Sequence, residues 1–209
     1  MSCQKIELQK VSKRFGFEWI FKGVNATFEA GQSYAVLGSN GSGKSTLMQV
    51  IASSLSPSKG EILYSDEAGK DIVVEKVQQH LSWAAPYLEL IEELSLKELV
   101  TFQSRFKPFV NQLSVNNVIE LVELPNVRKK AIRNYSSGMK QRVKLVLAIL
   151  ADTSILLLDE PATNLDAHAT EWYRQLVHQY TQNRIVIVAS NQEKEYDFCD
   201  HQIEIGVYK

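Results

Sequence analysis

The residues with the clearest chemistry run from Gly38 to Thr46, Gly-Ser-Asn-Gly-Ser-Gly-Lys-Ser-Thr. They match the spacing G-x-x-x-x-G-K-[ST], the phosphate-binding loop pattern. The glycines free the backbone to turn its N–H groups inward around phosphate oxygens, and a following helix start adds positive potential. Lys44 can then reach the β- and γ-phosphates, and Ser45 can hold Mg²⁺. The predicted nucleotide-binding residues are Gly38, Ser39, Asn40, Gly41, Ser42, Gly43, Lys44, Ser45 and Thr46.

The residues on either side decide whether this pattern is more than a glycine-rich turn that binds nothing. Ser33–Leu37 is a short apolar run suited to a buried parallel strand. After the loop, Leu47, Val50 and Ile51 recur at helical spacing. A strand end and a helix start in register are the context that the phosphate loop requires, so we favour the phosphate site.

A second group of chemical residues follows a buried strand. Ile155–Leu158 is apolar throughout, and Asp159 and Glu160 come directly after it. Strand ends of this kind deliver side chains to the edge where α/β sheets bind ligands. Asp159 would accept from the Mg²⁺ shell, as the second-motif aspartate of phosphate-loop ATPases does, and Glu160 would polarise the attacking water.

Other elements are expected around these two sites. Apolar and polar residues alternate at 5–11, which predicts a half-buried strand, and Val24–Phe28 is predicted as another. Further short strands are expected at 61–64, 71–74, 81–84, 154–158, 184–189 and 202–206. Helices are expected at 94–106 with Ser95 as N-cap, at 114–124 before Pro125, at 137–151 and at 166–180.

Composition limits the class of protein. The 209 residues are 44% hydrophobic and 22% charged, with a net charge of −1, so nothing suggests nucleic-acid binding. No apolar run is long enough to span a membrane, and the first residues lack a signal-peptide core. The two cysteines, Cys3 and Cys199, have neither metal nor redox spacing and suit a reducing cytoplasm.

A third motif carries a family resemblance. Residues 135–142, Tyr-Ser-Ser-Gly-Met-Lys-Gln-Arg, resemble the signature motif L-S-G-G-Q of ABC-transporter ATPases. They precede Asp159 by some twenty residues, as in that family. Residues 161–166, Pro-Ala-Thr-Asn-Leu-Asp, look like its D-loop, and Phe15 matches the aromatic residue that stacks on adenine. The resemblance covers essentially the whole chain.

The resemblance implies an α/β fold of the phosphate-loop NTPase (RecA-like) type. It comprises a mostly parallel sheet core, an N-terminal antiparallel β subdomain and an inserted helical subdomain. Residues 1–209 would form one ATP-binding domain, with 1–84 and 152–209 as the core and 85–151 as the helical signature subdomain. Two copies, or this chain and a paired ATPase subunit, would sandwich two MgATP head to tail. In trans the nucleotide would meet Ser136, Ser137, Gly138 and Met139.

Two positions depart from the family pattern. Asn191 stands where a histidine is usual, and an asparagine amide cannot carry charge or pass a proton. Pro86 stands where a glutamine usually ligands Mg²⁺ and senses the membrane partner, and proline offers neither a side-chain oxygen nor an N–H. We therefore expect slower turnover than is typical of the family.

Three functional readings stay open at this point. In the first, the chain is the ATPase subunit of a transporter on the cytoplasmic face of the membrane, and residues 87–91 are either packed core or the dock for a transmembrane permease subunit. Its short length resembles haem-exporter ATPases of cytochrome c maturation. The second is a soluble ABC ATPase with non-membrane partners. The third is a slow nucleotide-gated dimer, which the presumed base Glu160 argues against. A phosphate-loop kinase would need an acceptor site and a lid, for which we find no residues.

Overall fold

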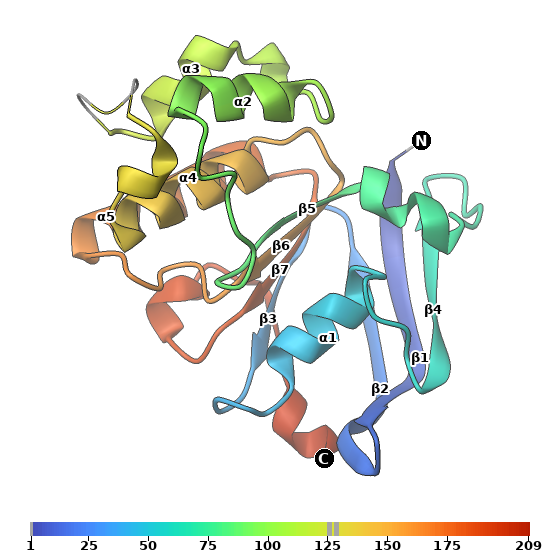
Figure 1. The fold of residues 1–209 in the computed structure, drawn as a ribbon. Coiled ribbons are helices and arrows are strands. Elements are labelled where there is room, and N and C mark those ends of the chain that lie inside the picture. The colour runs from blue at the N-terminus through green and yellow to red at the C-terminus, as the bar shows by residue number, and fades with distance from the viewer. Residues whose placement is uncertain (1, 125–126, 128–129) are drawn as a thin grey trace. The chain divides into compact units, whose positions relative to one another are not determined.

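The computed structural model describes residues 2–124, 127 and 130–209. The described chain forms two compact units. Figure 1 draws its helices and strands as a ribbon coloured by residue number. The strand unit consists of Met1–Trp83, Thr153–Asp159 and Thr181–Lys209, and the helical unit of Ala84–Asp152 and Glu160–Tyr180. Residues 160–180, which we had expected in the ATP-binding core, thus group with the helical segment.

The strand unit begins with a three-stranded antiparallel sheet in the order β2-β1-β4. β1 spans Cys3–Phe15, β2 spans Glu18–Glu29 and β4 spans Lys59–Asp66. Val24–Phe28, expected as a short strand, is thus one part of a longer hairpin arm. Buried side chains of this sheet, such as Phe21, Phe28 and Tyr64, join the core of the unit.

The second sheet has the order β5-β6-β7-β3-β8. Its members are β3 (Ser33–Leu37), β5 (Leu81–Ala84), β6 (Ile155–Asp159), β7 (Ile185–Ala189) and β8 (His201–Glu204). The pairs β6–β7, β7–β3 and β3–β8 are parallel, and every residue of β6 and β7 is buried. Helix α1 (Lys44–Ile51) packs against β6 and β7. The predicted fold class is confirmed.

Four α-helices occur in the described residues of the helical unit. They are α2 (Leu96–Ser104), α3 (Val115–Leu121), α4 (Ser137–Ile149) and α5 (Ala167–Tyr180). Ser95 caps α2 and Ser114 caps α3, each in a capping box, so the serines mark helix starts as their side chains allow. α2 packs on α3 and α4, and α4 packs on α5.

The strand predicted at 71–74 is wrong. Asp71 makes only an isolated bridge to Ser65, and Val74–Gln79 forms a 3₁₀ helix, η1. A β-branched run forms a strand only where a neighbouring strand accepts it, and here the chain turns away after one pair. Pro125, the expected end of the helix predicted at 114–124, lies outside the described residues. Short 3₁₀ turns also occur at Val110–Gln112 (η2), Ile132–Asn134 (η3), Glu193–Glu195 (η4) and Ile205–Tyr208 (η5).

Candidate functional site

The loop between β3 and α1 has the backbone that only glycine tolerates at three positions. Gly38, Gly41 and Gly43 have φ of +148°, +74° and +106°. A Cβ on Gly38 would lie 2.5 Å from Ser42 Oγ, and one on Gly43 would lie 2.7 Å from Ile20 Cγ2. A Cβ on Gly41 would meet nothing within 4 Å. The first and last glycines therefore fit against neighbours, while the middle one faces open space.

Lys44 folds back over this loop. Its side chain is buried, and Nζ donates hydrogen bonds to the carbonyl oxygens of Gly38 at 2.7 Å and Ser39 at 3.1 Å. The first intrahelical bond of α1 runs from Leu47 N to Gly43 O, so the N–H groups of residues 44–46 lie at the open end of the helix. An ammonium and a helix start thus converge on one loop, which makes the loop electropositive.

Ser42 adds a donor to the same loop. Its side chain is 2% exposed, and among the described residues Oγ has no hydrogen-bond partner. A buried hydroxyl without a partner is costly, and a ligand oxygen that accepts from it would remove that cost. Donors without acceptors are what a bound phosphate needs.

The carboxyl ends of three adjacent strands meet beside this loop. Ala189, the last residue of β7, pairs with Val36 of β3 on one side and with Asp159 of β6 on the other. Asp159 is 1% exposed. The parallel register therefore puts the second-motif aspartate at the same sheet edge as the phosphate loop, as the sequence predicts.

Glu160 leaves that edge by an abrupt turn. Its φ is +46°, unusual for a residue with a side chain, and its carbonyl accepts a hydrogen bond from Thr163 N at 3.1 Å. Strain of this kind costs of order 1–3 kcal/mol and persists where the surroundings enforce it. Of the two consecutive carboxylate residues, Asp159 thus ends a strand and Glu160 lies in a turn.

The signature segment begins α4. Ser136 is its N-cap and accepts from Met139 N at 3.3 Å. Gly138 lies against the loop before α5, since a Cβ there would be 2.7 Å from the carbonyl oxygen of Asn164. Buried Gln141 donates to the carbonyl oxygen of Pro161 at 2.8 Å. The signature helix and the 161–166 loop are therefore fitted to each other at two points.

A family model described as ABC transporter matches residues 21–163, more than half of the chain. This chain belongs to the ABC transporter family. The matched residues include the phosphate loop, the signature segment and the carboxylate pair.

The curated relatives share between a quarter and a third of their residues with this chain. The sulfate/thiosulfate import ATP-binding protein CysA of Synechococcus elongatus is 31% identical over 93% of this chain and 58% of its own length. The lantibiotic transport ATP-binding protein SrtF of Streptococcus pyogenes is 25% identical over 89% of this chain and 79% of its own length. The chain thus spans a little over half the length of the CysA relatives that it matches.

Solved structures show the same fold. An ABC transporter ATP-binding protein from Pyrococcus furiosus superposes with a TM-score of 0.82 at 24% identity, covering 98% of this chain and 99% of that one. A dimeric bacterial ABC transporter cassette gives 0.79 at 22% identity, covering 96% and 95%. The ABC cassette fold is therefore shown.

Asn191, in the usual histidine position of the family, lies at the phosphate loop. Its amide Nδ2 donates to Asn40 Oδ1 at 3.1 Å, although the residues are 151 positions apart. Ser190 is fully buried and donates to Glu195 Oε2 at 2.5 Å, and Gln192 N donates back to Ser190 Oγ at 2.9 Å. This buried carboxylate, which we did not single out in the sequence, fixes the loop that presents Asn191. Only its i+5 spacing from Ser190 could have suggested it.

Pro86 is exposed. It has no side-chain amide, and its backbone carbonyl is instead bound by a lysine of α4. Lys144 Nζ donates to the carbonyl oxygens of Pro86 at 3.0 Å and Ala85 at 3.4 Å. Burial lowers the pKa of Lys144, and the nearby charge of Glu89 opposes that shift. One turn earlier, Lys140 pairs with Glu92 at 2.5 Å. Two lysines thus tie residues 85–92 to the signature helix.

Phe15 ends β1 and is 51% exposed, with Lys13 Nζ 5.2 Å from its ring centroid. Ile20, on the facing strand, touches the start of α1 at Gly43. The predicted adenine platform therefore belongs to a hairpin that packs on the phosphate loop. His168, just after the 161–166 segment, is exposed on α5.

Proposed function

We propose that the chain binds and hydrolyses ATP within a head-to-tail dimer and so drives a separate transmembrane permease subunit. The observation that carries the proposal is the meeting of the Lys44 loop, Asp159 and Asn191 at one sheet edge. Family membership and the names of the transport relatives support it. On this proposal the chain is peripheral, on the cytoplasmic face of the membrane.

The donor set fits nucleoside-triphosphate and Mg²⁺. The Gly38–Thr46 loop offers N–H groups, the Ser42 hydroxyl and the Lys44 ammonium to phosphate oxygens. Ser45 and Asp159 supply the hard oxygen ligands that Mg²⁺ prefers beside phosphates and water. When bound, the metal supplies neutralisation of developing charge on the phosphates. No cluster of three metal-binding His, Cys, Asp or Glu occurs in the described part of the chain, so the phosphates must complete the shell.

Glu160 is the proposed general base. Its carboxylate would accept a proton from the attacking water, and Lys44 would stabilise negative charge on the phosphate oxygens. A positioned base contributes about a hundred- to ten-thousand-fold in rate. Asn191 would hold the phosphate end of the site with a neutral amide.

The signature segment supplies the other half of a shared site. Ser136, Ser137, Gly138 and Met139 form a helix start whose N–H groups can hold a phosphate from the opposite protomer. Ser136 and Ser137 are exposed, as a surface that meets another chain requires. Both halves are needed for turnover, so the active form is a homodimer or a dimer with a related subunit.

The permease dock is proposed at residues 87–91. Tyr87, Leu88 and Ile91 are 45%, 36% and 42% exposed, which favours a binding surface over packed core. No helix in the described residues is long and apolar enough to cross a membrane, so on this proposal the membrane part belongs to the partner.

The test is phosphate release from purified protein with MgATP, alongside Glu160→Gln. We expect turnover in the wild type and a loss of at least about a hundredfold in the variant, with ATP binding kept. His178→Gln, an exposed change on α5 outside the proposed site, serves as the handling control. Equal turnover in both proteins would remove Glu160 from the base role.

A slow nucleotide-gated dimer is the second candidate, favoured by Asn191 and Pro86 in place of the usual histidine and glutamine. A neutral amide stabilises a charged transition state less than an imidazolium does. A rate of tens per second at saturating MgATP would rule this candidate out. Membrane fractionation distinguishes the transporter subunit and the nucleotide-gated dimer from a soluble ABC ATPase. The likeness to haem-exporter ATPases stays a prediction.

A further inference from the structure

Three cations surround a single indole ring at the end of the antiparallel sheet. Arg14 Cζ, Lys22 Nζ and Lys59 Nζ lie 5.6, 5.9 and 5.5 Å from the ring centroid of Trp19. They come from β1, β2 and β4. All of these residues belong to the strand unit. We call Arg14, Phe17, Trp19, Lys22 and Lys59 the hairpin patch.

The charge of the hairpin patch is not neutralised within the protein. In the part of the chain that the structure describes, neither Arg14, Lys22 nor Lys59 forms an ion pair, and the ion pairs that exist lie elsewhere. Glu18 is the one acidic residue between positions 10 and 22. The whole chain carries −1, so this positive field is local and attracts anions to this one place.

The tip of the same hairpin is aromatic and bare. The turn at Gly16 and Phe17 joins β1 to β2, with a φ of +57° at Gly16, as hairpin turns with glycine at their first central position have. Phe17 is 99% exposed. Arg14, Lys22 and Lys59 are exposed, with their charged groups beside one ring and a second, exposed ring at the tip. Cations and apolar rings side by side favour an interface between an apolar and an anionic layer.

We propose that the hairpin patch docks the protein on an anionic membrane surface. Arg14, Lys22 and Lys59 would meet the phosphates of lipid headgroups, and Phe17 would enter the headgroup layer. Basic residues beside an anionic leaflet and aromatic rings at headgroup depth are the two interactions that hold peripheral segments at membranes. This contact requires neither ATP nor a permease, so its test is independent of the test of the proposed function.

The contact is specific in its chemistry. An acidic protein segment would satisfy the three cations but would leave Phe17 bare. A neutral membrane would accept Phe17 but not the three charges. Only a surface with both phosphates and an apolar layer satisfies the whole patch.

The experiment is co-sedimentation of the full chain with vesicles, without nucleotide. Vesicles of phosphatidylcholine alone are compared with vesicles that also contain phosphatidylglycerol. We expect binding to the anionic vesicles that weakens as salt is raised. Each cation removed should lower the partition coefficient about fivefold, so Lys22→Gln with Lys59→Gln should lower it about 25-fold.

Two further variants sharpen the result. Lys97→Gln with Arg133→Gln removes two exposed cations from the helical unit and should leave vesicle binding within about twofold of wild type, since those residues lie outside the patch. Phe17→Ala should weaken binding while keeping its salt dependence, because it removes no charge. Unchanged thermal unfolding of all variants shows that they fold.

Three outcomes would overturn the docking surface. Wild-type protein that ignores anionic vesicles is the first, and it would also be the result if the patch served an acidic protein. Equal binding to neutral vesicles is the second. Equal loss of binding in the patch and control variants is the third, since it would indicate only nonspecific charge.

Discussion

At the residue scale, the site depends on close steric packing as well as on hydrogen bonds. Gly138 illustrates this. Its place in the signature segment could be read as conformational freedom at a helix start, but its backbone is helical and ordinary. What excludes a side chain there is the carbonyl oxygen of Asn164, 2.7 Å from where a Cβ would lie. Asn164 itself has a φ of +65°, a conformation unusual for a residue with a side chain.

Gly138→Ala should therefore destabilise the protein by about 1–3 kcal/mol, the usual cost of overpacking. The measurement is the midpoint of urea unfolding. Ser137→Ala, next in sequence and exposed, is the matched control and should stay within about 0.5 kcal/mol of wild type. If both variants have the same urea midpoint, the 161–166 loop moves aside at no cost and is not closely packed on the signature helix.

Cys3 predicts a pH dependence of stability. Burial raises the pKa of its thiol from 9.0 to about 11. Because the folded pKa is the higher one, the folded state holds the proton more tightly. The contribution to stability is whole below about pH 9 and is lost as pH rises to about 11, to a total of about 3 kcal/mol.

Cys3→Ala should then lose less stability than wild type between pH 8.5 and 11, measured by urea unfolding at each pH. Burial raises the pKa of Tyr64 to about 12, and the nearby Cys3 thiolate adds to that rise. Tyr64 therefore contributes the same trend to both proteins, less in the variant, which acts in the same direction as the prediction. If the free energy of unfolding falls equally with pH in the two proteins, the pKa of the Cys3 thiol is not raised by folding.

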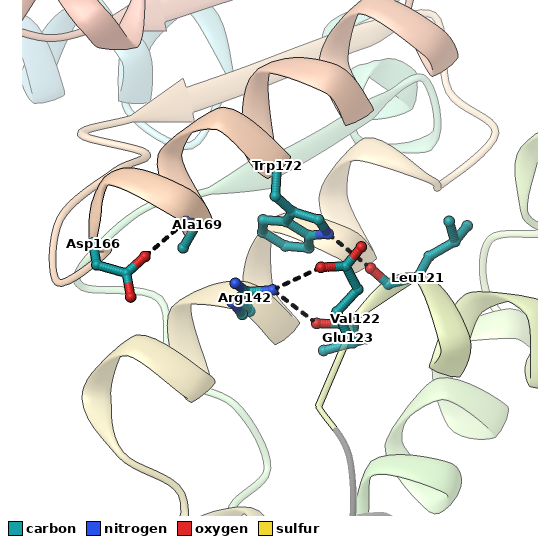
Figure 2. Close-up of polar contacts among 7 residues, drawn as sticks. All are labelled: Leu121, Val122, Glu123, Arg142, Asp166, Ala169 and Trp172. Carbon is teal, nitrogen blue, oxygen red and sulfur yellow. Dashed lines mark hydrogen bonds and ion pairs between the residues drawn. The ribbon is translucent and has the colours of Figure 1, made fainter.

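At the scale of elements, three helices of the helical unit meet at one cluster, which Figure 2 shows. Arg142 of α4 lies with its guanidinium 4.6 Å from the ring centroid of Trp172 on α5. Trp172 Nε1 donates to the carbonyl oxygen of Leu121 at 3.0 Å, and Arg142 Nη1 lies 3.5 Å from that of Val122. These carbonyls belong to the end of α3, where groups without intrahelical partners need donors. The same α5 begins at Asp166, whose Oδ1 accepts from Ala169 N at 2.7 Å.

Trp172→Phe keeps most of the ring and removes the donor. We expect a loss of about 0.5–1.5 kcal/mol, the net worth of one hydrogen bond, since the part-buried carbonyl of Leu121 loses its donor. We also expect faster hydrogen exchange at the end of α3. His178→Gln, exposed on the same helix, is the control. Unchanged exchange at α3 in the Trp172 variant would mean that the indole does not hold the helix end.

At the scale of the whole molecule, ATP should stabilise the fold by linkage. A ligand at about a thousand times its dissociation constant adds roughly 4 kcal/mol, and for a chain of this size each kcal/mol raises the melting temperature by about 2–4 °C. MgATP should thus raise it by about 8–16 °C. Lys44→Ala, which removes the loop's ammonium, should show little shift relative to its own nucleotide-free value. A full shift in that variant would place the nucleotide elsewhere.

The local signals in the chain were readable without a structure, because each is carried by neighbouring residues. The glycine spacing at 38–43, the apolar runs at β3, β6 and β7, and the serine cap at 95 all act within a few positions. These determined the phosphate loop, the parallel core and the start of α2. The strand expected at 71–74 failed for the converse reason, since a strand depends on a partner that the sequence does not name.

Tertiary structure alone decided which distant residues share a site. Asn191 meets Asn40 because β7 lies next to β3 in the sheet, and strand order is not written in any local pattern. Gly138 meets Asn164 because α4 packs on α5, and residues 160–180 group with the helical unit for the same reason. The gathering of Arg14, Lys22 and Lys59 around Trp19 likewise needs three strands side by side. Such contacts arise from packing between elements, so sequence spacing can supply their members but not their pairing.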